Sequence, residues 1–536
     1  MKRNILLSLS LLMLALIFAA SRAQVPASQK LRAAEQAIAQ LYVDTVNEDR
    51  LVEDAIKGML EGLDPHSSYS NAEETRELNE PLQGNFSGIG ISFNMTSDTL
   101  YVIQTIPGGP SERVGLLAGD RILKVNDTII AGVKMRNSDI MKRLRGPKGS
   151  TVDIRVMRRS AGKTDSIDFR ITRDDIPIHS VDAAYMVNDS TGYIRVNKFA
   201  ADTRSEVEEA MISLLGQGMR NLILDLTDNG GGYLNAAVEI LGELLEPGRM
   251  TVYTEGRNSP RTEMPARPRG IKPLFGDGRL VVMANQYSAS AAEITAGAIQ
   301  DWDRGVVVGR RTFGKGLVQR PLPFPDGSMI RLTVAHYYTP TGRDIQKPYT
   351  KGDQKSYAHD IIDRLNRGEL MHADSIRVVD SLRVNTLRLN RPIYGGGGIT
   401  PDFFVAIDTT DYTPYYRNVM AKGAINKYVI GYVDENRKAI RKLYPTDGDY
   451  VKKFTVSDNM LDDLYKIAAA EGVDPDSEQA EKSAPLFKTI IKALIGRDVY
   501  ESATYFKVWN RYDPIFREAL RVIESDDYNR TLSPAQ

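Results

Sequence analysis

The sequence predicts an α/β protein: a mixed α/β core, an inserted β-rich module and a helical C-terminal extension. Short β-branched or leucine-rich runs alternate with helical stretches over residues 176–345, which is typical of an α/β layer. Residues 84–175 instead hold short apolar runs separated by Gly, Pro, Asn and Asp, as in a small β-rich module. Residues 410–536 carry apolar residues at helical spacing.

Composition excludes several classes of protein. The chain has 536 residues, enough for several domains. Its 69 basic residues balance its 69 acidic ones, so no overall field favours nucleic acid as a partner. It has no cysteine, which excludes disulfides, thiolate metal sites, a cysteine nucleophile and a lipoprotein anchor.

The N-terminus has the pattern of a secretory signal peptide. Lys2 and Arg3 precede an almost wholly apolar run over residues 5–20, and Ser21-Arg22-Ala23 offers a small-x-small cleavage site. The alternative is an uncleaved anchor, but the run is shorter than the ~20 residues of a spanning helix. We therefore expect a signal peptide at 1–23 and an exported protein of the periplasm or cell envelope, membrane-associated if the segment is uncleaved.

The elements then follow in order. Residues 24–83 are expected to be helical up to a turn at Asp64-Pro65-His66. In the β-rich module at 84–175, Ser138 is expected to cap a helix that carries Ile140 and Leu144 on one face. Its expected strands are 89–93, 100–106, 121–125, 152–157 and 167–171.

The α/β core is expected over 176–408. Its expected strands are 192–196, 222–226, 280–284 and 306–309, and its expected helices are 204–215, 234–245 and 291–300. Residues 346–392 form a polar insertion with an expected helix at 374–387, and 409–536 form the helical extension. Apolar faces within 30–60 and 455–525 could pack internally or join subunits in a homo-oligomer.

Glycines near the start of the β-rich module suggest a peptide-binding groove, although a plain β-hairpin would also explain them. A ligand strand would add beside residues 89–93, pack against the helix of Ile140 and Leu144, and place its carboxylate on the Gly88–Gly90 amides. The expected peptide-binding residues are Gly88, Ile89, Gly90, Ile91, Ile140 and Leu144.

This module resembles a PDZ domain. Arg145-Gly146-Pro147-Lys148-Gly149 follows its helix, as in the PDZ modules of the carboxyl-terminal processing peptidases, also called tail-specific proteases. The resemblance implies protein partners with apolar C-terminal tails, and a regulatory role for Arg145 in gating by tail binding; a surface arginine that supports a turn is the alternative.

Ser290 follows the expected strand 280–284 and opens the next helix. Ser290-x-x-Glu293 is a capping box, the commonest reason for serine at a helix start. A nucleophile would also benefit here, because helix N-terminal amides stabilise negative charge. No Gly-x-Ser-x-Gly motif or histidine in a nucleophile context accompanies it.

Lys315 is the candidate base. It lies between Gly314 and Gly316, where a solvated turn is the ordinary explanation. A buried lysine, however, can lose its proton, if its pKa falls from about 10.4 toward about 7–8. Phe313 and Leu317 could supply that burial.

Together these motifs resemble the tail-specific protease family, which has serine in Ser-Ala-Ser-Ala-x-Glu and lysine in Phe-Gly-Lys-Gly at this spacing. The resemblance implies that Gln319 orients Lys315, and that a glycine N–H from Gly231 or Gly232 joins that of Ala291 in an oxyanion hole. The family usually has arginine at the position of Thr227 and often proline at that of Gly230.

The resemblance therefore implies a serine endopeptidase that needs no cofactor and no metal. It would use a Ser/Lys pair with glutamine and form an acyl-enzyme. The alternative is a non-catalytic PDZ scaffold on a protease fold.

Overall fold

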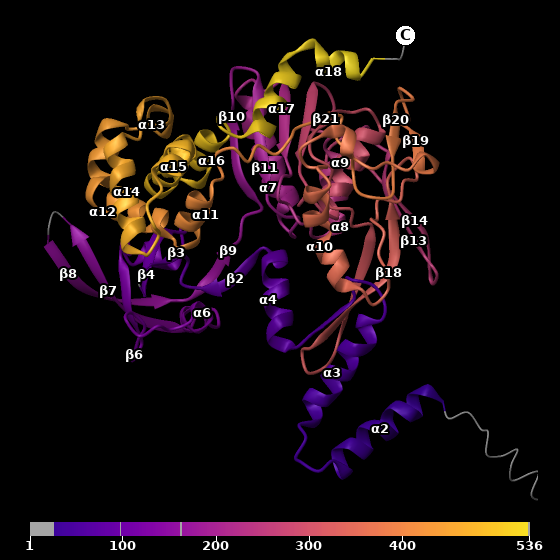
Figure 1. The fold of residues 1–536 in the computed structure, drawn as a ribbon, viewed down its shortest axis with the longest axis horizontal. Helices are drawn as coiled ribbons and strands as arrows, with labels where there is room; N and C mark the ends of the chain where they lie inside the picture. The colour runs from indigo at the N-terminus through magenta and orange to yellow at the C-terminus, as the bar shows by residue number, and fades with distance from the viewer. Residues whose placement is uncertain (1–25, 97, 161–162, 534–536) are drawn as a thin grey trace, which may run out of the picture.

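The computed structural model describes residues 26–96, 98–160 and 163–533. The signal peptide expected at 1–23 lies outside the described residues. Within these ranges, no helix is both long and apolar enough to cross a membrane. The α/β core, the β-rich module and the helical C-terminal region are all present (Figure 1), so the predicted fold class is confirmed.

A six-stranded sheet forms the centre of the α/β core, in the order β10-β11-β12-β15-β16-β21. All neighbours run parallel except β10, which pairs antiparallel at one edge. Strands covered on both faces read as continuous apolar runs, which is why the sequence located four of them. The strands are Val181–Met186, Thr191–Val196, Asn221–Asp225, Arg279–Ala284, Val306–Gly309 and Phe403–Phe404.

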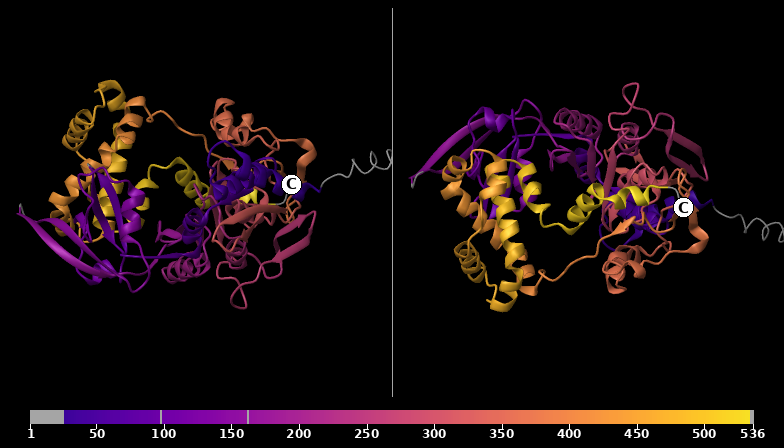
Figure 2. Two further views of the ribbon diagram at one scale, coloured as in Figure 1. Left: turned by 90° about the horizontal axis from the view of Figure 1, so that it is seen from below. Right: turned by 90° about the horizontal axis from the view of Figure 1, so that it is seen from above.

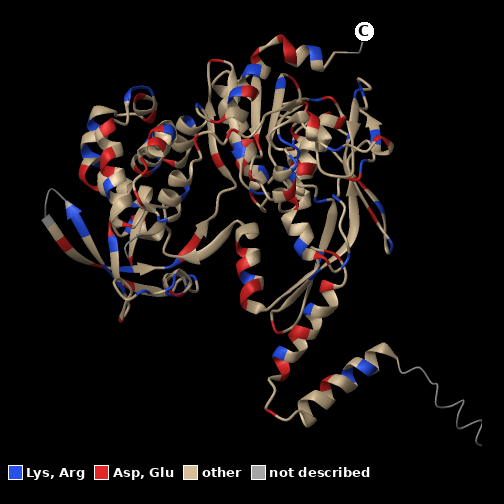
Figure 3. Cartoon of the chain, in the orientation of Figure 1, with Lys and Arg blue, Asp and Glu red and all other residues tan. Residues whose placement is uncertain are grey.

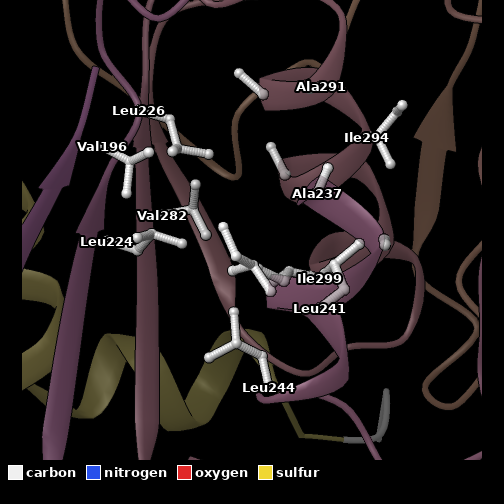
Figure 4. Close-up of a cluster of buried hydrophobic side chains, with 14 of the residues drawn as sticks. Val196, Leu224, Leu226, Ala237, Leu241, Leu244, Val282, Ala291, Ile294 and Ile299 are labelled. Carbon is white, nitrogen blue, oxygen red and sulfur yellow. The ribbon is translucent and has the colours of Figure 1, made fainter. Parts of the chain in front are cut away.

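Helices cover both faces of this sheet. Leu224 and Val282 point to one face, where they meet Leu241 and Ile299 (Figure 4). Ile223 points to the other face and joins a cluster with the C-terminal helix α17, as the alternation of side chains along a strand requires. The helices are α7 (Thr203–Gly216), α8 (Leu234–Gly242) and α9 (Ala291–Asp301) on the first face and α17 (Pro514–Glu524) on the second.

A second sheet has the order β1-β18-β13-β14, with β17 also paired to β18. The pairing of β17 with β18 shifts register between Val318 and Gln319. Such a bulge bends a strand and redirects its side chains. The strands are β1 (Ser68–Ser70), β13 (Met250–Gly256), β14 (Ser259–Pro265), β17 (Leu317–Pro323) and β18 (Met329–Tyr338).

The β-rich module is a sheet in the order β3-β4-β5-β7-β8, with β3 at one edge. The expected cap is wrong, because helix α6 begins at Asn137 with Arg136 as its cap residue, so Ser138 lies inside the first turn. The strands are β3 (Ile91–Thr96), β4 (Thr99–Thr105), β5 (Arg121–Val125), β6 (Thr128–Ile129, paired to β5), β7 (Thr151–Ser160) and β8 (Lys163–Thr172), with helices α5 (Pro110–Arg113) and α6 (Asn137–Leu144). A ribbon of β2 (Asn85–Gly88) and β9 (Asp174–Pro177) connects the module to the core.

The helix expected at 374–387 is wrong. That segment holds two short 3-10 helices, Ala373–Ser375 and Asp380–Leu382, and strand β19 (Arg383–Asn385), which pairs with β20 (Pro392–Tyr394). Its valines and isoleucine disfavour helix and favour extended backbone. The helix of the insertion is instead α10 (Gln354–Asn366), which Asp353 caps by accepting the Ser356 N–H.

Helices at the two ends of the chain have different surroundings. α2 (Ala27–Leu41) and α3 (Glu48–Glu61) project from the core, and α4 (Ala72–Gln83) lies between the core and the β-rich module (Figure 1). The C-terminal helices form a bundle beside that module (Figures 1 and 2). They are α11 (Pro414–Ala421), α12 (Ala424–Leu443), α13 (Asp447–Lys453), α14 (Asp458–Ala470), α15 (Ser477–Val499), α16 (Ser502–Trp509), and beyond it α17 and α18 (Asp526–Thr531).

Two contacts hold the bundle to the β-rich module. Arg121 forms a buried ion pair with Asp434 of α12, and the Gln104 side chain donates to the Arg497 carbonyl at 2.8 Å. Basic and acidic residues are otherwise interspersed along the chain (Figure 3).

Candidate active site

Ser290 occupies the turn between strand β15 and helix α9, as the sequence predicted. Its φ of 56° is in the left-handed region, which a residue with a side chain adopts only when its surroundings fix it there. Its N–H donates to the Glu293 carboxylate at 2.8 Å. Since it stands at the amino end of α9, free amides of the first helical turn lie next to it.

The neighbouring serine has a different role. Ser288 is fully buried; its hydroxyl donates to the Leu226 carbonyl at 2.7 Å and accepts the Asn285 N–H at 2.9 Å. The first bond joins the turn before α9 to the end of β12, and the second closes the turn on itself. Ser288 therefore supports the loop, and Ser290 is the better candidate nucleophile.

Glu293 ties the Ser290 turn to the Lys315 loop. Besides the Ser290 N–H, its carboxylate accepts the N–H groups of Lys315 at 2.8 Å and Gly314 at 2.7 Å, and the Thr312 hydroxyl at 2.5 Å. The side chain is fully buried, and this burial raises its pKa although the hydrogen bonds oppose the shift. The sequence showed only the capping-box half of this arrangement.

Tyr337 of β18 makes a second link between the same two segments. Its buried hydroxyl contacts the carbonyl oxygens of both Ser290, at 3.2 Å, and Lys315. Glu293 holds the two N–H groups and Tyr337 the two carbonyls, so Ser290 and Lys315 are brought together from both sides of the backbone. We call this arrangement the Glu293–Tyr337 clamp. No pattern in the sequence indicated the part played by Tyr337.

The surroundings of Lys315 favour its neutral form. Its pKa is lowered, first because burial disfavours the charged amine and second because Arg331 lies nearby; Glu293 and Asp64 oppose the shift. A neutral amine can accept a proton. His66 lies in the same region, and burial together with the charge of Lys315 lowers its pKa to about 4, so it is uncharged near neutral pH.

Gln319 is not joined to Lys315 by a hydrogen bond among the described residues. Its amide donates to the Leu317 carbonyl at 3.0 Å and to the Thr333 hydroxyl at 3.4 Å. The Thr333 hydroxyl donates in turn to Asp64, which begins the turn predicted from Asp64-Pro65-His66. Gln319 therefore belongs to a hydrogen-bond network that reaches Asp64 through Thr333.

The glycine loop, residues 227–232, lies directly beside Ser290. A Cβ placed on Gly231 would come within 2.7 Å of the Ser290 Cβ and 3.0 Å of the Ala291 nitrogen. The Gly231 N–H already donates to the Asn229 side chain at 2.8 Å, so Gly232 is the more available of the two expected glycine donors. The first-turn N–H of Ala291 faces the same region.

The expected peptide-binding residues fall into two groups. Gly88 to Ile91 lead into β3, which is an edge strand of its sheet, the kind of strand beside which a ligand strand can add. Ile140 and Leu144 are 0% and 4% exposed and pack inside the module, so they do not line an open groove as the sequence suggested. Their buried positions follow from the apolar face of α6, which packs toward the sheet.

Arg145 contacts helix α4, outside the α/β core. It pairs with Glu80 and stacks on Phe86, 4.6 Å from the ring centre. Lys142 likewise pairs with Glu73 of α4 at 2.6 Å. A cavity of about 650 Å³ lies between α4 and α6 beside these ion pairs.

Two further supporting residues, Arg195 and Tyr193, were not predicted from the sequence, and both bond Asp225, which the sequence marked only as the start of the glycine motif. Asp225 accepts the Tyr193 hydroxyl at 2.5 Å and the Arg195 guanidinium at 2.7 Å, at the start of the glycine loop. Arg195 is an isolated charge in an apolar strand, and that is the one signal that could have marked it. No cluster of His, Cys, Asp and Glu suited to a metal ion occurs in the described part of the chain.

Family profiles match four parts of the chain. The peptidase family S41 profile matches residues 190–356 and a PDZ-domain profile matches 87–171. The profile of the N-terminal domain of the activating protease CtpB matches 18–75, and a family of unknown function matches 415–501. A solved photosystem II D1 C-terminal processing protease is 28% identical, with 61% of this chain and 92% of that chain covered and a TM-score of 0.33.

Two relatives carry the assignment. A carboxy-terminal-processing protease of Bartonella bacilliformis is 34% identical over 309 residues, which cover 57% of this chain and 69% of that protein. The carboxy-terminal processing protease CtpA of Bacillus subtilis is 32% identical over 336 residues, covering 61% and 70%. The chain is a serine peptidase of the carboxy-terminal processing protease family, peptidase family S41, and carries a PDZ domain.

Proposed function

We propose that this chain is an exported endopeptidase that cleaves proteins recognised through apolar C-terminal tails, with Ser290 as nucleophile and Lys315 as general base. The observation that carries the proposal is the Glu293–Tyr337 clamp, which joins the Ser290 and Lys315 segments. A retained clamp argues against the alternative, a non-catalytic PDZ scaffold.

In the first half-reaction, the Ser290 oxygen attacks the scissile carbonyl carbon while neutral Lys315 takes the hydroxyl proton. The glycine loop and the Ala291 N–H hold the oxyanion. The peptide C–N bond then breaks, Lys315 returns the proton to the leaving amine, and an ester on Ser290 remains. In the second half-reaction, water attacks the ester carbonyl while Lys315 takes a proton from the water. The bond between the acyl carbon and the Ser290 oxygen then breaks, Lys315 gives the proton to that oxygen, and the acid product leaves.

The role of Gln319 in this scheme is indirect. Since it hydrogen-bonds Thr333 and not Lys315, we assign it to holding the β17–β18 hairpin on which the Lys315 loop depends. A shift on substrate binding would be needed for direct contact with the lysine.

Tail capture is assigned to the edge of β3 and the Gly88–Gly90 amides, with Met141 as the more exposed apolar residue of α6. Export is proposed from the N-terminal pattern alone. A homo-oligomer through α2 and α3 is proposed from their exposed apolar residues, among them Leu31, Ile38 and Leu41. Sedimentation of the chain with and without Leu41→Glu would test that oligomer.

Cleavage of an unfolded protein substrate tests the central proposal. Ser290→Ala and Lys315→Ala should each abolish turnover in a folded protein, because the two residues act as a unit; the expected loss is about 10⁴-fold or more. Ser288→Ala should retain much of the activity while it lowers the melting temperature, since it loses two buried hydrogen bonds. Loss of turnover in Ser288→Ala with activity retained in Ser290→Ala would reverse the assignment.

A further inference from the structure

The start of the glycine loop is held from the neighbouring strand. Arg195 of β11 donates to the Asp225 carboxylate at 2.7 Å, to the Thr227 hydroxyl at 2.7 Å and to the Thr227 carbonyl at 3.1 Å. Its guanidinium thus binds both the last residue of β12 and the first residue of the loop. The side chain is only 13% exposed, so these bonds are shielded from water.

The hydrogen bonds of Arg195 help to set the position of the amide groups in the glycine loop. Downstream, the Asn229 carbonyl accepts the Ala289 N–H at 2.9 Å, and Asp228 is bonded to Asn285 through both its N–H and its carboxylate. The loop is therefore fixed to the Ser290 turn at one end and to Arg195 at the other. A shift at Thr227 would move the glycine amides relative to the Ser290 oxygen.

Arg195 is covered in turn by the C-terminal region. Phe506 of α16 lies over the guanidinium, 4.9 Å from its central carbon, and α16 is fastened to β10 by a 2.8 Å hydrogen bond between Asn510 and the Tyr185 hydroxyl. An aromatic face over a guanidinium stabilises the cation and fixes its plane. The helix that supplies Phe506 lies just beyond the segment matched by a family of unknown function.

We propose that Arg195 is a positioning residue for the oxyanion-binding loop, and that the C-terminal region completes the active site by holding Arg195 through Phe506. This proposal rests on the proposed function. Position 227, where the tail-specific protease pattern has arginine, is threonine here, and Arg195 supplies a guanidinium to the Asp225 carboxylate from the adjacent strand. The planar fork of arginine suits simultaneous bonds to a carboxylate and a carbonyl, which a lysine cannot reproduce.

The test compares two inhibitors on the full-length protein. A peptide aldehyde adds to the Ser290 oxygen and places its own oxygen in the oxyanion site, whereas the matching peptide alcohol binds without that adduct. Arg195→Lys and Thr227→Val should raise the inhibition constant of the aldehyde by about 10- to 100-fold and lower kcat by a similar factor. The inhibition constant of the alcohol and KM should change less than about twofold, as expected when only interactions specific to the transition state are lost.

A second pair of variants tests the C-terminal contact. Phe506→Leu should raise the inhibition constant of the aldehyde by about threefold and leave that of the alcohol unchanged. Ser502→Ala, at the exposed start of the same helix, should change neither inhibition constant. Arg195→Met leaves Asp225 buried without its cation, which can unfold the protein. The double variant Arg195→Met/Thr227→Arg is therefore measured beside it. It should bind the aldehyde more tightly than Arg195→Met does, because it restores a guanidinium near Asp225.

Loss of aldehyde and alcohol affinity in parallel, or an unchanged aldehyde constant in both Arg195→Lys and Thr227→Val, overturns the positioning role. Failure of the proposed function would look different. In that case the aldehyde would bind Ser290→Ala and Lys315→Ala as tightly as it binds the wild-type protein.

Discussion

The candidate active site and the PDZ domain are joined to their surroundings in opposite ways. Around the candidate nucleophile, fully buried Glu293 and Tyr337 hold the Ser290 and Lys315 segments through backbone groups. The PDZ domain is joined to α4 by side-chain ion pairs that water can reach; in the Lys142–Glu73 pair the side chains are 51% and 50% exposed.

This difference indicates a rigid candidate active site and a more easily displaced PDZ domain. Breaking a buried hydrogen bond costs about 1–3 kcal/mol, whereas an exposed ion pair contributes about 0–1 kcal/mol and is screened by salt. The exception is the buried Arg121–Asp434 pair, which fastens the PDZ domain to the C-terminal bundle. The PDZ domain therefore has one firm attachment, to the bundle, and one weak attachment, to α4.

Removing the buried carboxylate should have the largest effect on this comparison. Glu293→Ala leaves four donors without their acceptor, and each buried unsatisfied donor costs about 1–3 kcal/mol. We expect a loss of at least about 4 kcal/mol in unfolding free energy and of about 10³-fold in turnover. Denaturant unfolding and peptide cleavage measure the two, with exposed Glu481→Ala as the control. Turnover within threefold of wild type would contradict a rigid site built on Glu293.

The parts of this site that depend on a short stretch of sequence were predicted, whereas the contacts between distant segments were missed. Ser290, Lys315 and the glycine loop each stand beside an apolar strand with a recognisable pattern, because strands buried on both faces are apolar throughout. Glu293 was visible as a cap, but its acceptance of Thr312, Gly314 and Lys315 depends on how β16 returns beside β15. The same holds for Tyr337.

Misplaced features have similar physical causes. Ile140 and Leu144 were placed correctly on one face of a helix, yet periodicity does not say whether that face meets a ligand or the domain's own sheet. The segment 374–387 has apolar residues at helical spacing, but Leu387 is instead bonded to the Asp301 carbonyl and Thr386 to Arg391, which extends the chain. Tertiary contacts decided both.

The pH dependence of cleavage reports on the protonation of Lys315 in the candidate active site. Because the pKa of Lys315 is lowered and the neutral amine is the proposed base, kcat/KM should rise about tenfold per pH unit below that pKa and level off before pH 10.5. Arg331→Gln should move the rise to higher pH, since it removes a positive charge that favours the neutral amine.

Histidines provide the control for this profile. The pKa of His66 is about 4, so it does not titrate between pH 6 and 9, whereas the hydrogen bond to Asp344 raises the pKa of His336 above 6.5. His336→Gln should leave the rise in place; its disappearance in that variant would assign the profile to His336. Stability should also increase with pH between the folded pKa of Lys315 and 10.5, because the unfolded chain binds the extra proton.

The smallest expected effect concerns the weak attachment of the PDZ domain. Arg145 links Phe86, just before the Gly88–Gly90 amides, to Glu80 of α4, so a bound tail carboxylate could compete with Glu80 for this guanidinium. Arg145→Ala should lower turnover of a tail-bearing substrate about threefold while a C-terminal peptide binds within about twofold of wild type. The matched control is Arg143→Ala, because the Arg143 guanidinium bonds only the Asp139 carbonyl within the described structure.

Met141→Asp should have the opposite effect and weaken binding of the C-terminal peptide more than it lowers turnover, because it adds a charge at an exposed apolar position of α6. Ile140→Asp would instead bury a carboxylate in the domain core and unfold the domain. Fluorescence anisotropy of the peptide and cleavage rates at low and high salt measure both effects. Unchanged turnover in Arg145→Ala would exclude a switch at this contact, and the PDZ domain would then act as a tether held by Arg121 and Asp434.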